Sequence, residues 1–174
     1  MCSSDLMIGT GASSGFSNVL MNRPRSRVIA GKFFGCIGQG LPAAMGASVA
    51  LGNQPLVLMD GDASVMMHVN DFDTAARYGI PLLVIVLSDQ ALGSEYHKLR
   101  AHNMKAELSV IPTPYIGTVA TAFGGRGRLV RSVDQLEASV REWLSQPGPT
   151  IIDMRISRNV ESLATRRLQF GRDE

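Results

Sequence analysis

Uninterrupted apolar stretches, separated by segments with helical spacing, dominate the hydrophobic pattern of this chain. Short buried strands are predicted over the apolar runs 55–60 and 81–87, with a brief strand over residues 128–131 and a last strand over residues 149–157. Helices are predicted where apolar residues recur at helical spacing, over residues 41–52, 69–79, 114–124 and 132–144. Strands that are apolar on both faces need helices on both sides of a sheet. The pattern therefore predicts an α/β fold, a three-layer, doubly wound, mostly parallel sheet.

Punctuating residues mark the ends of the predicted helices. Pro42 suits a first helical turn, and Gly52 and Gly79 suit helix ends. Ser132 and Gln135 form a capping box for the last helix. The first helix has almost no polar side, so we expect it to be deeply packed. The last helix is expected to turn these side chains inward: Val133, Leu136, Val140 and either Trp143 or Leu144.

Composition and charge narrow the class of protein. Hydrophobic residues make up 45% of the 174 residues and charged residues 18%, which is typical of a globular domain. The formal net charge of +2 is too small to indicate nucleic acid or an anionic membrane as a partner. The longest strongly apolar run, 81–87, is far shorter than a membrane span. With two cysteines and no disulfide framework, a cytoplasmic location is expected.

The chain is predicted to form one domain, over residues 9–157, followed by a polar C-terminal tail, residues 158–174. We interpret residues 1–8 as a truncated or non-native start, because CSSDL (2–6) is what an in-frame sequencing-adapter read would encode. The stretch TGASSGF (10–16) has some likeness to a dinucleotide-binding loop, but it lacks the final glycine. Residues 88–100 are expected to form a polar loop that can turn helical.

Acidic residues follow two successive predicted strands. Asp60 and Asp62 end the 55–60 strand, and Asp89 follows the next one. One strand–helix–strand crossover separates Asp62 from Asp89, so both are expected at the same edge of the sheet. Two carboxylates there suit Mg²⁺, while Ser64 and nearby backbone N–H groups suit phosphate oxygens. A metal–diphosphate site and a pair of helix-capping aspartates both fit this spacing.

Three motifs in order resemble the family of thiamine diphosphate (ThDP) decarboxylases and acetohydroxyacid (acetolactate) synthases. They are GCIGQGLPAAMGASVAL (35–51), GDAS (61–64) and LSDQALG (87–93). The resemblance runs over most of residues 9–155, and the GDA form is most similar to acetolactate synthases. It implies the diphosphate-binding domain of the ThDP-binding fold, with ThDP and Mg²⁺ as cofactors.

The resemblance implies a metal site. Asp62 and Asp89 would ligate Mg²⁺ through their side chains, and Ala91 through its backbone carbonyl. The family has an Asn-Asn or Asn-Asp pair where this chain has Ser88 and Asp89. Asp89 thus adds negative charge beside Asp62, which bears on metal affinity and preference.

The resemblance also implies cofactor contacts. Gly61, Ala63 and Ser64 would contact the diphosphate. Gly35 and Ile37 would meet the aminopyrimidine through backbone atoms, and the Ile37 side chain would hold the cofactor bent.

No catalytic residue is assigned, because the activating glutamate of the family lies on an N-terminal pyrimidine-binding domain that has no counterpart here. The resemblance therefore implies part of a decarboxylase or carboligase that acts on a 2-oxo acid and forms a homodimer or homotetramer. The pyrimidine-binding domain would come from the same or a partner subunit. Two alternatives stay open: a separate subunit of a split enzyme, and a non-catalytic ThDP-fold binding protein.

The surroundings of several side chains near these motifs can also be predicted. His97 and Lys98 are expected in a solvated loop, Cys36 as a small buried thiol, and Met66 and Met67 in the core.

Overall fold

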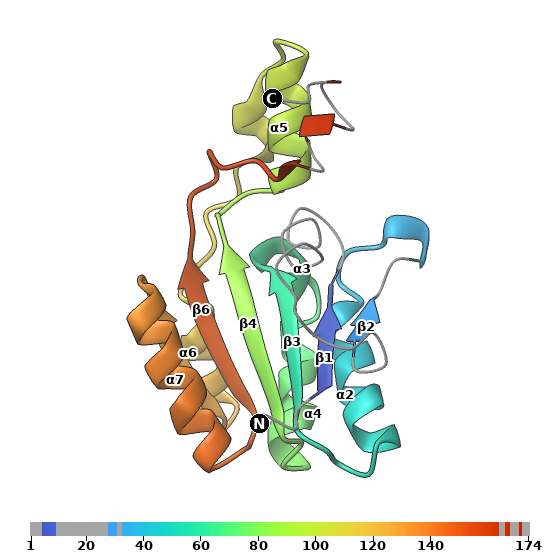
Figure 1. Ribbon diagram of the computed structural model, residues 1–174, viewed down its shortest axis with the longest axis vertical. Helices are drawn as coiled ribbons and strands as arrows, with labels where there is room; N and C mark the ends of the chain where they lie inside the picture. Colours follow the sequence, from blue (N-terminus) through green and yellow to red (C-terminus); the bar gives the residue numbers. More distant parts are fainter. Residues whose placement is uncertain (1–4, 10–27, 31–32, 164–165, 168–170, 172–174) are drawn as a thin grey trace.

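The computed structural model describes residues 5–9, 28–30, 33–163, 166–167 and 171. Its centre is a parallel sheet with strand order β2-β1-β3-β4-β6-β5 (Figure 1). The strands are β1 (Asp5–Ile8), β2 (Val28–Ala30), β3 (Leu56–Gly61), β4 (Leu82–Ser88), β5 (Arg126–Val130) and β6 (Thr150–Arg155). Every neighbouring pair is parallel, which confirms the predicted sheet.

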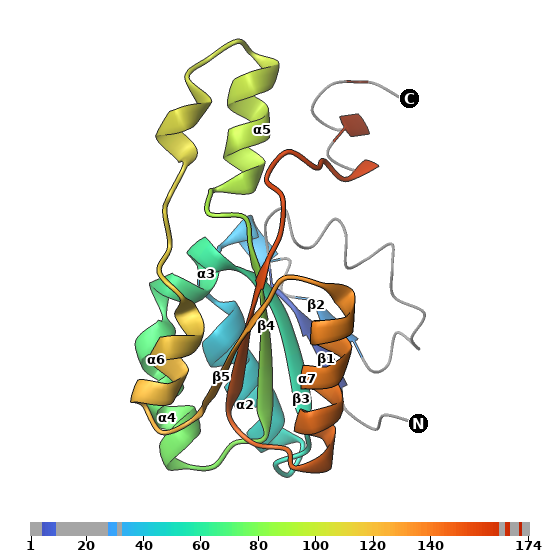
Figure 2. The ribbon, with the colours of Figure 1, turned by 90° about the vertical axis from the view of Figure 1, so that its left-hand side faces the viewer.

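Helices cover both faces of the sheet, so the fold has three layers (Figure 2). The α-helices are α2 (Gly40–Ala50), α3 (Asp62–Met67), α4 (Phe72–Arg77), α5 (Gly93–Ala101), α6 (Ile116–Ala122) and α7 (Val133–Ser145). Short 3-10 helices are η2 (Phe33–Gly35), η3 (Val69–Asp71) and η4 (Ala106–Ser109). None of the helices in the described part of the chain is long and apolar enough to cross a membrane.

Alternate side chains of the central strands build two separate cores. Val84 and Val86 of β4 point to the layer of α2, α4 and α6, together with Phe72. Leu83 and Ile85 point to the other face, where Trp143 of α7 is buried. β4 therefore reads as a continuous apolar run because each of its faces is covered by a helical layer.

The predicted helix ends are largely confirmed. At the end of α2, Gly52 has φ +75°, and its N–H bonds to the Val49 carbonyl at 3.0 Å. Gly79, with φ +60°, ends α4 in the same left-handed conformation. At α7, Ser132 Oγ accepts from the Gln135 N–H at 3.3 Å, and Gln135 Oε1 accepts from the Arg131 N–H. The capping residues are thus correct, although the glutamine bonds one residue further back than in a capping box.

Two packing predictions are wrong. Val133 is 70% exposed, because it is the first residue of α7 and points away from the sheet; Trp143, rather than Leu144, is the buried alternative. The α2 helix is not deeply packed all round: Leu41, Ala44 and Met45 face the sheet, whereas Val49 is 55% exposed. An apolar sequence with no polar side does not by itself show which face is covered.

The strands β1 and β2 were not predicted, because three or four residues are too few for a clear apolar run. β1 lies between β2 and β3, so the sheet includes residues of the segment 1–8, which the prediction placed outside the domain. That residues 1–8 are a truncated or non-native start stays a prediction. The stretch 10–16, which has some likeness to a dinucleotide-binding loop, lies outside the described residues.

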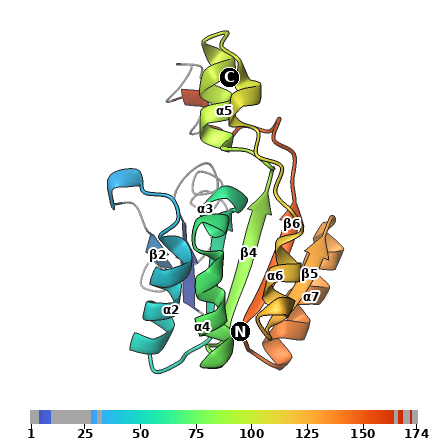
Figure 3. The same ribbon diagram turned by 180° about the vertical axis from the view of Figure 1, so that it is seen from behind.

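The chain between β4 and α6 leaves the sheet and returns to it. The expected polar loop 88–100 becomes helical as α5 from Gly93 onward. Figures 1 and 3 show α5 beyond the carboxyl ends of the strands, where the segment after β6 lies beside it. This segment approaches α5 closely enough for Glu161 to contact His97, so the edge of the sheet has a second structural layer above it.

Candidate functional site

The acidic residues meet at the carboxyl edge of the sheet, as predicted. β3 and β4 are neighbours, and Gly61 is in register with Leu87. Asp62 therefore follows the end of β3, next to the place where β4 ends at Ser88 and Asp89 follows it. In open parallel sheets, ligands bind outside the carboxyl ends of the strands.

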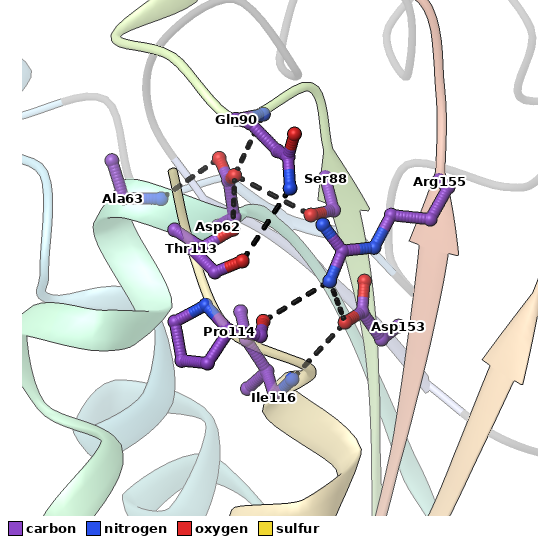
Figure 4. Close-up of polar contacts among 9 residues, drawn as sticks. All are labelled: Asp62, Ala63, Ser88, Gln90, Thr113, Pro114, Ile116, Asp153 and Arg155. Carbon is purple, nitrogen blue, oxygen red and sulfur yellow. Dashed lines mark hydrogen bonds and ion pairs between the residues drawn. The ribbon is translucent and has the colours of Figure 1, made fainter. Parts of the chain in front are cut away.

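Asp62 is held by hydrogen bonds from four groups (Figure 4). Its Oδ2 accepts from the Gln90 N–H at 2.9 Å, the Thr113 hydroxyl at 3.0 Å and the Ser88 hydroxyl at 3.4 Å. Its Oδ1 accepts from the Ala63 N–H at 2.9 Å. Burial raises the pKa of Asp62, and these donors oppose that rise. The carboxylate is thus fixed in one orientation at the edge of the sheet.

Asp89 lies close enough to Asp62 for the two charges to interact. Burial raises the pKa of Asp89 to about 6, and the charge of Asp62 adds to the rise. The Ala91 N–H donates to Asp89 Oδ1 at 3.0 Å, which orients the carboxylate within its own loop. Two partly desolvated carboxylates that repel each other fit a divalent cation, which would relieve the repulsion.

The described side chains offer few oxygen ligands for a metal ion at this edge. Among the residues that the structure describes, no group of three or more His, Cys, Asp or Glu side chains could hold a metal ion. A cation at Asp62 and Asp89 would therefore need further oxygens from backbone, solvent or a ligand. Mg²⁺ often binds through one or two carboxylates and completes its shell with waters and substrate phosphates, so the donor set fits this ion.

Asp60 has a different environment, although it lies two residues from Asp62. It is fully buried and accepts from the Gly61 N–H at 2.8 Å and the Ser64 hydroxyl at 2.6 Å. A Cβ built on Gly9 or on Gly40 would collide with its carboxylate. Burial raises the pKa of Asp60 to about 6. Asp60 therefore packs β1, β3 and the start of α2 together rather than facing the open edge.

The glycine-rich segment, residues 35–40, combines left-handed backbone with a close approach to Asp60. Gly35 and Gly38 have φ of +64° and +88°, and Gly40 approaches Asp60 closely. The Gly38 N–H donates to Ser64 Oγ at 2.8 Å, which ties the segment to α3. Ile37 is half-buried in the same stretch.

The structure narrows the role expected for Ser64. Its hydroxyl has one proton, which it donates to Asp60, while its oxygen accepts from Gly38. Because this side chain is buried and committed on both sides, a phosphate contact is left to its backbone. The Ala63 N–H already donates to Asp62 Oδ1, so a phosphate oxygen would share this donor with Asp62.

Sequence reasoning missed Thr113 and Gln90. Thr113 comes from the loop before α6, far along the chain from Asp62, and no local motif marks it. Gln90 acts through its backbone N–H, which any residue but proline offers. Contacts of this kind depend on the fold and cannot be read from residue type.

Several expectations about nearby side chains are wrong. His97 is 4% exposed, with Nδ1 3.0 Å from Glu161 Oε1, because the segment after β6 covers α5. Cys36 is exposed, and so is Met67, since α3 presents that side chain outward. Met66 packs against the core as predicted.

The fold is a three-layer α/β domain with acidic residues at the carboxyl edge of its parallel sheet, and comparison with known proteins gives its family. Residues 9–154 match the family described as "Thiamine pyrophosphate enzyme, C-terminal TPP binding domain", thiamine pyrophosphate being another name for ThDP. The chain belongs to this family, as its three motifs predicted.

Its curated relatives include subunits of acetolactate synthases. The chain is 35% identical to the large subunit of acetolactate synthase isozyme 2 of Escherichia coli K12, over 70% of this chain and 23% of that protein. It is 30% identical to the isozyme 1 large subunit of the same organism, over 78% and 24%. The mitochondrial catalytic subunit of Saccharomyces cerevisiae is 28% identical, over 80% and 20%. The chain thus spans between a fifth and a quarter of these relatives.

Proposed function

We propose that this chain is the ThDP- and Mg²⁺-binding domain of a 2-oxo acid carboligase or decarboxylase similar to acetolactate synthase. The convergence of Asp62 and Asp89 at neighbouring strand ends carries the proposal. Family membership supports ThDP as the ligand, and the similarity to acetolactate synthase subunits supports the reaction class. A pyrimidine-binding domain, from the same or a partner subunit, would complete the site in a homodimer or homotetramer.

The residues have distinct proposed roles. Asp62 and Asp89 hold Mg²⁺ through carboxylate oxygens, and Ala91 through its carbonyl. Gly61, Ala63 and Ser64 approach the diphosphate through their backbone.

Gly35 and Ile37, in the segment that is tied to Ser64 through Gly38, are proposed to meet the aminopyrimidine. ThDP, when bound, supplies the electron sink for breaking the bond to the carboxylate of a 2-oxo acid. The chain's part is to fix the metal and the diphosphate. We assign it no proton-transfer group.

The test is a calorimetric titration of ThDP into the folded chain, with and without Mg²⁺. We expect binding that requires Mg²⁺ and weakens by at least about tenfold in Asp62→Asn, because a carboxylate ligand is lost. Asp134→Asn is the matched control, since Asp134 is exposed in the first turn of α7. Circular dichroism establishes that each variant is folded.

Binding that is equal with and without Mg²⁺, or equal in Asp62→Asn and the parent chain, would contradict the metal site. If neither the parent chain nor Asp62→Asn binds ThDP, the claim that this chain holds the cofactor by itself is contradicted. Repeating the titration with a pyrimidine-binding domain added would then test whether that domain is required.

A further inference from the structure

A polar cavity of about 680 Å³ opens at the carboxyl ends of β4, β5 and β6. Its walls include Tyr96 on α5, Arg131 after β5 and the segment 155–159 at the end of β6. Asp89 lines this cavity, whereas Asp62 and the glycine-rich segment do not. The cavity therefore lies beside the proposed cofactor site and shares with it the wall formed by Asp89.

Positive charge predominates in this cavity. Arg131, Arg155 and Arg158 line it, against the single carboxylate of Asp89. Neither Arg131 nor Arg158 forms an ion pair within 4.0 Å with another residue that the structure describes. Arg158 acts on Asp89 only through space. Guanidinium groups in a concave site without direct partners attract anions, and their planar donors match carboxylate and phosphate.

The third arginine is held in place. Nη2 of Arg155 donates to Asp153 Oδ2 at 2.9 Å and to the Pro114 carbonyl at 3.0 Å (Figure 4). Its side chain is 16% exposed, and Asp153 is fully buried behind it. Nη1 and Nε of Arg155 make no hydrogen bond within the described residues, so they keep donors for a ligand. A fixed guanidinium loses less rotational freedom on binding than a mobile one.

We propose that this cavity binds a small polyanion that carries two or more carboxylate or phosphate groups. Arg131 and Arg158 would supply the charge, and Arg155 would orient one anionic group. The volume lies in the range of small-molecule sites. Ser157 and Asn159 also line the cavity and add neutral polar groups. The proposal does not depend on the cofactor or on its metal.

The experiment follows ¹⁵N–¹H spectra of the 18.7 kDa chain during titration with citrate and, separately, inorganic triphosphate. Buffer stripped of metal by a chelating resin keeps Mg²⁺ out without adding a soluble polycarboxylate, and KCl holds the ionic strength constant. We expect saturable shifts at the amides of Asp89, Ser157 and Asn159. Binding of both probes would define a site for polyanions in general. Binding of citrate alone would indicate a polycarboxylate ligand, and binding of triphosphate alone would indicate a phosphate ligand.

Variants separate this cavity from surface charge. Arg158→Gln and Arg131→Gln should each weaken binding by about tenfold, since each removes a charged partner. Arg141→Gln, on the exposed face of α7, should leave binding unchanged. Absence of saturable shifts at these amides would overturn the proposal. Equal weakening by Arg141→Gln would also overturn it.

Discussion

Asp60 and Asp62 stand two residues apart at the end of β3, and their surroundings differ in kind. Asp60 is enclosed by Gly9, Gly40 and Ser64, so its carboxylate joins three segments of the fold. Asp62 accepts from loop residues that follow β4 and precede α6. Burial raises the pKa of both.

The difference follows from where each side chain points. β3 alternates its side chains between the faces of the sheet, and the Asp60 carboxylate meets the start of α2. Asp62 begins α3, just beyond the last strand residue, and is 1% exposed beneath the loops that donate to it. A pair of acids in a sequence motif can therefore divide into one that joins β1, β3 and α2 and one that is bonded to the loops at the carboxyl edge of the sheet.

The largest effect is expected from Gly40→Ala. Its new Cβ would collide with the Asp60 carboxylate, which cannot move because it is bonded to Gly61 and Ser64. We expect a loss of about 3 kcal/mol in the free energy of unfolding, measured by urea denaturation. Unchanged stability would show that the Asp60 environment is not tightly packed.

Gly46→Ala, on the same helix, is the matched control for this substitution. A Cβ at Gly46 meets nothing within 4 Å, so the change affects helix propensity alone. We expect a gain of about 0.5–1 kcal/mol, opposite in sign to Gly40→Ala. Two losses of similar size would assign the effect of Gly40→Ala to the α2 backbone instead of to Asp60.

The sequence could predict the sheet, its main strands and the meeting of Asp62 with Asp89, because these follow from apolar runs and from the handedness of crossovers. It could not separate Asp60 from Asp62, because their roles depend on how β1 and α2 pack around the first of them. The short strand β1 had no pattern of its own.

Surface and core assignments failed for a related reason. Periodicity orders the faces of a helix, but it does not show which segment covers them. Val133 is exposed because α7 begins at the rim of the sheet, and His97 is buried because the chain after β6 crosses α5. Both outcomes depend on contacts between segments distant in sequence.

A second, smaller effect concerns pH. The pKa of Asp60 is about 6 in the folded chain against an ordinary value of 3.8, so the folded state binds this proton more tightly than the unfolded state. The contribution of Asp60 to stability is thus greatest below pH 4 and falls as pH rises through 6. Asp60→Asn lacks this titration, so the parent chain should lose about 2 kcal/mol relative to it between pH 4 and pH 7.

Urea denaturation of both proteins at a series of pH values measures this difference. Asp134→Asn, which changes an exposed carboxylate, should keep the pH dependence of the parent chain. A difference between the parent chain and Asp60→Asn that does not change with pH would show that Asp60 ionises as it does in the unfolded chain. Its burial would then have no consequence for the pH dependence of stability.

The smallest loss of stability is expected at the Asp62 environment, with Thr113→Val. This change keeps the shape of a buried side chain and removes one donor, 3.0 Å from Asp62 Oδ2. We expect a loss of about 1 kcal/mol in unfolding free energy, because Ser88 and Gln90 still donate to the same oxygen.

Binding should respond to Thr113→Val more than stability does. A carboxylate ligand that loses an orienting partner holds its metal less well, so Mg²⁺-dependent ThDP binding should weaken by about tenfold. Thr118→Val, an exposed position on α6, should change neither quantity. If Thr113→Val lowers stability and leaves binding intact, Asp62 belongs with Asp60 as an assembling group, and the division between the two acids fails.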